Sequence, residues 1–177
     1  MTDIIVIETD TKLSEYIARE MSKNYFVRYL RGTKLTESGS GYMLDILSTE
    51  SLTHICCQSA VVILGEGVEP EFNELSGKLT FIADSLDTKQ LTALSRCNHP
   101  VITCGTFEKD TVSYTSITED SVTVSLNRKV TALSGRSVQP LEFPVRMTHG
   151  YEIYHCLAVT ALRILLDDFD SDLGKLY

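Results

Sequence analysis

A lysine and several hydroxyl and carboxyl side chains follow a short apolar run near the start of the chain. The run, residues 4–7, is β-branched and predicts a buried strand, and helical spacing of apolar residues begins at Leu13. A helix that starts right after a strand can bind an anion, because its first N–H groups have no partner within the helix. The candidate residues for an anion or nucleotide are Thr9, Asp10, Thr11, Lys12 and Ser14. The alternative is structural: Asp10 or Thr11 caps the helix, and Lys12 is a solvated lysine of its first turn.

Asp84 is a further candidate for ligand binding. It ends a second apolar run, residues 79–83, and open α/β sheets bind ligands at the carboxyl ends of their strands. Asp87 lies nearby, three residues before Gln90, and this spacing is typical of a capping box at the start of a short helix. We therefore expect Asp87 to act as a cap and Asp84 to face the site.

Asp45 is the one candidate metal ligand. It lies in a possible strand over residues 42–47, and Mg²⁺ prefers carboxylate oxygens. A single carboxylate holds Mg²⁺ poorly without phosphates, so the sequence predicts no metal site. The alternative for Asp45 is a polar residue at the edge of the sheet.

The five cysteines do not form a recognisable framework. They are Cys56, Cys57, Cys97, Cys104 and Cys156. An odd count without a C-x-x-C pair argues against disulfides and zinc, and predicts reduced, mostly buried thiols in a cytoplasmic protein. A rival hypothesis is an enzyme in which Cys104 acts as a nucleophile with His149 or His155 as its base. Burial of an inert thiol is the alternative for Cys104.

Apolar runs and helical spacings alternate along the first part of the chain. Strands are predicted over 4–7, 26–30, 42–47, 60–64, 79–83 and 101–104, with helices after the first and fifth of these and a loop over 33–41. Strands that alternate with helices predict a largely parallel sheet covered on both faces.

The pattern changes after residue 111. Apolar and polar residues alternate over 112–117, 122–126, 129–133 and 143–147, which predicts an antiparallel subsheet with a turn at Ser134-Gly135. A long helix follows over 151–166, and Asp167, Asp168, Asp170 and Asp172 form an acidic tail expected to be solvated. We predict one three-layer α/β domain over 1–177. It comprises a parallel core (1–105), the antiparallel subsheet (106–148), and the C-terminal helix and tail (149–177).

Composition excludes two classes of partner. Sixteen Lys and Arg against 24 Asp and Glu give a net charge of −8, with no basic run, so we predict no nucleic-acid binding. No stretch approaches 18 apolar residues, and the N-terminus lacks the basic region of a signal peptide, so we predict no membrane contact.

The order of these segments resembles the ATP-binding central domain of the Mur ligase family, which includes the folylpolyglutamate synthetases. Residues 8–14 (E-T-D-T-K-L-S) stand where that family has its phosphate loop, G-T-x-G-K-[ST]-T. Four later segments resemble family motifs in the same order: 44–48 (L-D-I-L-S) is similar to M-E-V-S-S, 81–85 (F-I-A-D-S) to N-x-D-D, 101–105 (V-I-T-C-G) to V-I-T-[FY]-G, and 151–158 (Y-E-I-Y-H-C-L-A) to H-N-x-x-N-A-L-A. The resemblance implies the fold, ATP and Mg²⁺ as cofactors, and a role in bacterial cell-wall metabolism.

The phosphate loop is where this sequence departs most from the family. Glu8 and Thr11 replace the two glycines whose bare backbone closes around phosphates, and Leu13 replaces the hydroxyl that would bind Mg²⁺. Residues 65–67 lack the Asn and Asp-His of the ligases, and no lysine clearly matches the carbamylated one. We also expect no counterpart of the ligases' substrate domain and amino-acid domain.

Two functions from different classes follow. The first is a non-catalytic Mur ligase-like pseudoenzyme without a cofactor, which binds a protein partner or a small anionic ligand. The second is a nucleotide-binding or nucleotide-hydrolysing protein with a non-standard phosphate loop. Unpaired strands of the antiparallel subsheet could also pair between chains and produce a homodimer.

Overall fold

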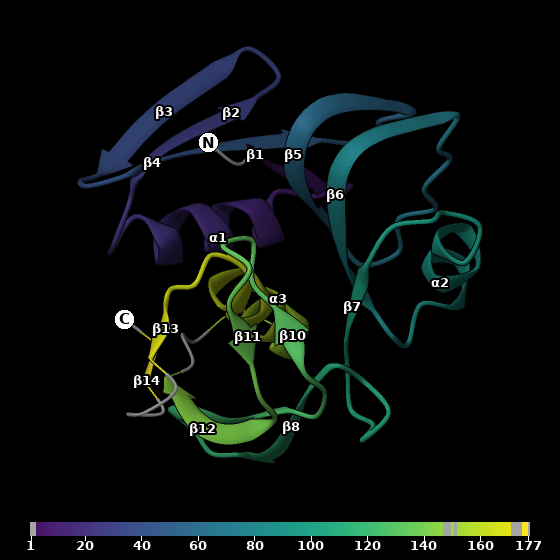
Figure 1. Ribbon diagram of the computed structural model, residues 1–177. Coiled ribbons are helices and arrows are strands. Elements are labelled where there is room, and N and C mark those ends of the chain that lie inside the picture. The colour runs from purple at the N-terminus through teal and green to yellow at the C-terminus, as the bar shows by residue number, and fades with distance from the viewer. Residues whose placement is uncertain (1–2, 147–149, 151, 171–174, 177) are drawn as a thin grey trace. The chain divides into compact units, whose positions relative to one another are not determined.

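A parallel sheet with helices on opposite faces forms the first of two compact units, Met1–Val101 and Ile102–Tyr177 (Figure 1). The computed structural model describes residues 3–146, 150, 152–170 and 175–176. The elements of the first unit are β1 (Asp3–Ile7), α1 (Lys12–Met21), β2 (Phe26–Arg31), β3 (Lys34–Gly39), β4 (Met43–Thr49), β5 (His54–Leu64), β6 (Glu74–Asp84) and α2 (Thr88–Leu94).

Strand order in the first unit is β6-β5-β1-β4-β2-β3. Every neighbouring pair is parallel except β2 and β3, which form an antiparallel hairpin at the edge. The expected strands before residue 84 are all present, but 34–39 is a strand and not part of a loop. It has no buried residue, so its sequence carries no burial pattern, and the strand exists by pairing with β2.

The two helices cover opposite faces of this sheet. On one face, α1 packs against β2, where the Ser14 hydroxyl lies 2.8 Å from the Tyr29 hydroxyl. On the other face, Leu94 of α2 joins a core cluster with Phe81 and Val62. This arrangement confirms the three layers.

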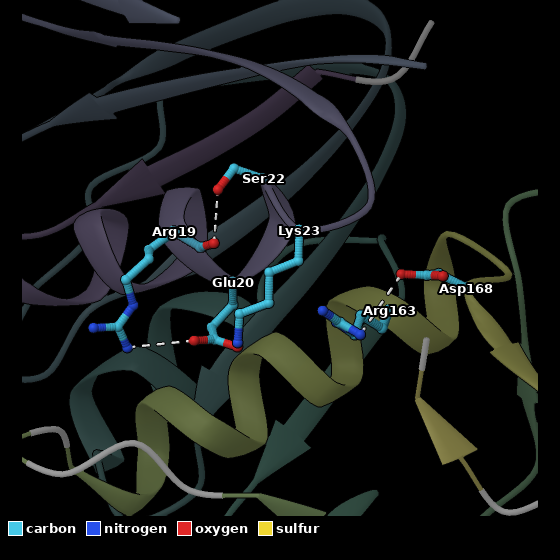
Figure 2. Close-up of polar contacts among 6 residues, drawn as sticks. All are labelled: Arg19, Glu20, Ser22, Lys23, Arg163 and Asp168. Carbon is cyan, nitrogen blue, oxygen red and sulfur yellow. Dashed lines mark hydrogen bonds and ion pairs between the residues drawn. The ribbon is translucent and has the colours of Figure 1, made fainter. Parts of the chain in front are cut away.

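Helix α1 also carries a small network of charges around Glu20, a largely buried carboxylate. The Arg19 guanidinium lies 3.3 Å from Oε1 of Glu20, and Lys23 Nζ lies 2.5 Å from Oε2 (Figure 2). The apolar residues Leu13 and Ile17 are buried, as their helical spacing predicts.

The second unit is mainly antiparallel. Its elements are β7 (Val101–Cys104), β8 (Val112–Ile117), β9 (Ser121–Leu126), β10 (Val130–Thr131), β11 (Ser137–Val138), β12 (Leu141–Arg146), α3 (Ile153–Leu165), β13 (Phe169–Asp170) and β14 (Lys175–Leu176). Strand order is β12-β9-β8-β7, with β7 and β8 parallel and the other pairs antiparallel. The predicted antiparallel subsheet is confirmed, and with it the mostly parallel α/β class. The extent of a single domain over 1–177 stays a prediction.

The acidic tail differs from the expectation of a solvated segment. Asp167 pairs with Arg136 at 3.3 Å, and Asp168 lies 3.9 Å from Arg163, a largely buried arginine of α3 (Figure 2). Both carboxylates therefore have basic partners, which spacing along the chain does not reveal. Asp172 lies outside the described residues.

Candidate functional site

The carboxylate of Glu8 occupies the N-terminus of α1. Glu8 directly follows β1 and is only 2% exposed. Its Oε2 accepts hydrogen bonds from the N–H groups of Leu13 and Ser14, both at 3.1 Å, and its Oε1 accepts one from the Ser48 hydroxyl at 2.8 Å. The first-turn amides that would hold a phosphate in a phosphate loop thus hold a side chain of the same molecule.

The remaining amide of this turn is also taken. The Lys12 N–H donates to Oδ1 of Asp10 at 3.1 Å, and Lys12 Nζ lies 3.8 Å from Oδ2 of the same residue, with both side chains exposed. Thr11 occupies the N-cap position without a side-chain hydrogen bond to the helix. Of the two caps that the sequence offered, Asp10 therefore accepts from a first-turn amide and Thr11 does not.

The hydroxyl of Ser14 points into the protein. Ser14 is fully buried, and its Oγ lies 2.8 Å from the Tyr29 hydroxyl and 3.4 Å from the Thr11 carbonyl oxygen, to which it donates. Thr9, in contrast, is exposed. Of the five residues predicted at this junction, Thr9, Asp10 and Lys12 are thus the ones that solvent reaches most freely.

Asp84 is linked to the same edge of the sheet through Gln90. The buried Gln90 side chain donates from Nε2 to the Gly65 carbonyl oxygen at 2.6 Å and accepts at Oε1 from the Asp84 N–H at 3.3 Å. Gly65 lies directly against Glu8: a Cβ on Gly65 would be 2.8 Å from the Glu8 Cβ, closer than real Cβ contacts allow. The structure therefore places both predicted parts of the site at the carboxyl ends of β1 and β6, the strands on either side of β5.

The carboxylates of Asp84 and Asp87 mainly accept hydrogen bonds from nearby backbone N–H groups. Oδ1 of Asp84 accepts from the Leu86 N–H at 2.9 Å. Asp87 caps α2 as predicted, with Oδ1 accepting from the N–H groups of Lys89 and Gln90 at 3.0 and 3.1 Å. The capping box is incomplete, because the Gln90 side chain reaches Asp84 and Gly65 instead of the Asp87 N–H.

Asp45 lies away from these residues. In the register of β1 with β4, Asp45 is opposite Asp3, whereas Ile7, next to Glu8, is opposite Thr49. The guanidinium Nε of Arg28 lies 3.3 Å from its Oδ1. Within the part of the chain that the structure describes, no three His, Cys, Asp or Glu side chains are grouped as metal ligands would be.

The cysteines are free thiols of mixed exposure. Cys104 and Cys156 are buried, Cys57 and Cys97 are half-buried, and Cys56 is exposed. The expectation of mostly buried thiols is therefore only partly met. Cys104 and His155 are both almost fully buried, which does not suit a nucleophile that must meet a substrate, and His149 lies outside the described residues.

The structure also contains a cavity that no sequence pattern indicated. It has a volume of about 620 Å³ and lies between the segment that leads into β6 and the segment after α2. It is lined by Pro70, Glu71, Phe72, Asn73, Glu74, Leu75, Ala93, Arg96, Cys97, Asn98 and His99. These residues lie just before or at the start of β6, or at or after the end of α2, so the cavity is at the opposite end of β6 from Asp84.

Solved structures share this arrangement of elements. No family model and no curated protein matches the sequence. The structure of a UDP-N-acetylmuramoyl-L-alanyl-D-glutamate–2,6-diaminopimelate ligase matches 96% of this chain with a TM-score of 0.51 and 10% identity. MurF ligase from Thermotoga maritima, solved with ADP, matches 99% with a TM-score of 0.53 and 11% identity. The fold is that of the Mur ligases.

A third Mur ligase structure agrees with these two. The UDP-N-acetylmuramate:L-alanyl-gamma-D-glutamyl-meso-diaminopimelate ligase from Neisseria meningitides matches 93% of this chain, with a TM-score of 0.54 and 12% identity. The chain spans 43%, 48% and 61% of the three ligases in the order given. It thus has a Mur ligase-like fold but covers less than two thirds of each whole ligase. Among the described residues, no helix is long and apolar enough to cross a membrane.

Proposed function

We propose that this chain is a non-catalytic, Mur ligase-like module that acts by binding a partner and not by phosphoryl transfer. The observation that carries the proposal is the Glu8 carboxylate, which accepts hydrogen bonds from two first-turn amides of α1 and from Ser48. Phosphoryl transfer depends on positioning and charge neutralisation of the phosphates. A site filled by a buried carboxylate of the same chain supports neither.

Charge at this edge also disfavours a polyphosphate. Besides Glu8, the carboxylates of Asp10, Asp84 and Asp87 lie at or just after the ends of β1 and β6, and Asp10 already pairs with Lys12. One like-charge pair at 4 Å costs about 1–4 kcal/mol at the effective dielectric constants of water and protein surfaces. A protein partner therefore suits this edge better than the small anionic ligand that the sequence also allowed at Thr9, Asp10, Thr11, Lys12, Ser14 and Asp84.

Two of the structural neighbours are named as ligases of UDP-N-acetylmuramoyl or UDP-N-acetylmuramate compounds. On this likeness we propose a link to cell-wall metabolism, and UDP-linked sugars are the first ligands to test. The free cysteines support a reducing compartment, so we propose that the protein acts in the cytoplasm. We also propose that it acts without bound ATP, Mg²⁺ or another cofactor.

Thermal unfolding with and without ligand tests the proposal. We expect no change in the melting temperature of the full chain with millimolar ATP and Mg²⁺. An active nucleotide site would instead gain about 2.7 kcal/mol of stability at a ligand concentration 100 times the dissociation constant, and Lys12→Ala would abolish that gain. A saturable, Lys12-dependent shift in melting temperature with ATP would overturn the proposal of a non-catalytic protein. The same kind of shift with a UDP-sugar would show that the ligand is a small anion and not a protein partner.

A further inference from the structure

One transverse row of apolar side chains crosses the whole sheet of the first unit. Successive strand pairings place the members of this row opposite one another. In spatial order they are Phe81, Val62, Ile5, Leu47, Leu30 and Leu35. Phe81 and Val62 are 0% exposed, whereas Leu30 is 40% exposed and Leu35, on the edge strand β3, is 53% exposed. The row therefore begins in the core and ends in solvent.

The outer part of this row lies on the face away from α1. Tyr29, which contacts α1 through Ser14, alternates with Leu30 along β2, so the two side chains point to opposite faces. Met43 shares the face of Leu30 and is also exposed. Parallel sheets are normally covered on both faces, and exposed apolar groups beside one another mark interaction surfaces.

The edge strand β3 offers main-chain groups to a further strand. It is the last strand of the sheet, with β2 on one side, and in an antiparallel ladder every second residue directs its N–H and C=O to the outer edge. Edges are often blunted by proline. The edge strand β12 of the second unit carries Pro144, but β3 has no proline, so β3 is the better edge for pairing.

We propose that two copies of this chain associate through β3, in an antiparallel pair that places Leu35 of each copy opposite Leu35 of the other. Such a pair would extend the apolar row without interruption from one sheet into the second. The two Leu35 side chains would then lie side by side on the same face. The inference does not rest on the proposed function, because it uses no residue of the edge that carries Glu8.

Charges on β3 select this register. In a symmetric antiparallel pair, one residue of β3 lies directly opposite the same residue of the other copy. We call this residue the crossing. A crossing at Lys34 or at Glu37 sets like charges directly opposite, which is destabilising. A crossing at Thr36 sets Leu35 against the carboxylate of Glu37. A crossing nearer Gly39 uses backbone that is no longer extended, because Gly39 has a φ of 82°. A crossing at Leu35 avoids all three problems, which is why we name a second copy as the occupant.

Light scattering on the full chain tests the association. We expect the wild-type protein to have twice the mass of one 19.7 kDa chain. Leu35→Lys and Leu35→Glu should each be monomeric, because each puts like charges opposite one another at the crossing. An equimolar mixture of the two variants should return to the dimer mass, because the opposite charges then meet. Leu86→Lys, which changes a leucine of similar exposure away from β3, should remain dimeric.

Each contrary result overturns the proposal. A monomeric wild-type protein at high concentration removes the association, and a dimeric Leu35→Lys variant removes β3 as its site. A mixture that stays monomeric removes the Leu35 register. Circular dichroism spectra of both variants should match that of the wild type, because Leu35 is exposed, and this shows that a loss of dimer is not a loss of folding.

Discussion

The Ser48 hydroxyl donates a hydrogen bond of 2.8 Å to Oε1 of Glu8, although forty residues separate the two in sequence. Ser48 is near the end of β4, and Glu8 follows the neighbouring strand β1. This contact fixes the carboxylate so that its other oxygen faces the amides of Leu13 and Ser14. A side chain in this position acts as an internal anion for α1.

Glu8→Ala should lower the free energy of unfolding by about 2–4 kcal/mol. The loss follows because hydrogen bonds to a charged acceptor contribute about 1.5–3 kcal/mol and the amides left behind are buried. Urea denaturation measures it. Glu15→Ala, an exposed carboxylate in the same helical turn, should cost less than about 1 kcal/mol. Equal losses in the two variants would show that Glu8 has no special role at the helix start.

Gln90→Leu should cost about 1–3 kcal/mol of stability. The side chain of Gln90 is 0% exposed and holds both the Gly65 carbonyl and the Asp84 N–H, and leucine of similar size would leave these groups without partners. The exposed Gln58 is the control: Gln58→Leu should change stability by no more than about 0.5 kcal/mol. A neutral Gln90→Leu would mean that water replaces the amide at no cost.

Asp87→Ala should destabilise the protein by about 1 kcal/mol, because the variant loses the side-chain cap of α2. Asp87→Asn should retain most of that stability, since the amide oxygen can still accept from Lys89 and Gln90. Chemical denaturation of the three proteins side by side distinguishes the two changes. If alanine and asparagine behaved alike, the hydrogen-bonded cap would not be the source of the effect.

The thiols should differ in their rates of alkylation. Burial raises the pKa of the Cys97 thiol. The pKa of the Cys57 thiol is raised mainly by burial and further by the negative charges of Asp3 and Cys56. Because the thiolate is the reactive form, iodoacetamide at pH 8 should modify the exposed Cys56 first, as mass spectrometry of peptides would show. Faster labelling of Cys97 than of Cys56 would contradict this order.

The same shifts have a consequence for stability. A thiol whose pKa is higher in the folded than in the unfolded chain stays protonated to a higher pH in the folded protein. Its contribution to the free energy of unfolding is therefore constant at pH values below 9.0, the ordinary pKa of a cysteine thiol. The free energy of unfolding falls as the pH rises above that value. Replacing Cys57 and Cys97 by serine should flatten the pH dependence of the melting temperature above pH 9.

Sequence reasoning located the buried elements well and the exposed ones poorly. β-branched runs such as 60–64 predict strands because burial on both faces selects those residues. The first halves of β5 and β6, and all of β3, carry polar residues and were missed. Their strands arise from pairing with neighbours, and the signal for β3 was the short Gly32-Thr33 turn, where Gly32 has a φ of 52°.

The site shows a similar division. The sequence singled out Glu8 as a replacement for a phosphate-loop glycine. It did not show that the carboxylate turns back to accept from Leu13 and Ser14, because that depends on Ser48 and on the narrow space beside Gly65. Such contacts come from strand order, which residue spacing alone does not specify.

Because α1 finds its acceptors within the chain, the junction between β1 and α1 is ordered as soon as the protein folds. In a protein whose phosphate loop is stabilised by its ligand, the supply of that ligand also sets the folded fraction and the resistance to proteases. Here the Glu8 carboxylate is part of the same chain, so its hydrogen bonds to α1 do not depend on the concentration of any ligand. The folded fraction of this protein should thus be insensitive to the concentration of a phosphate ligand.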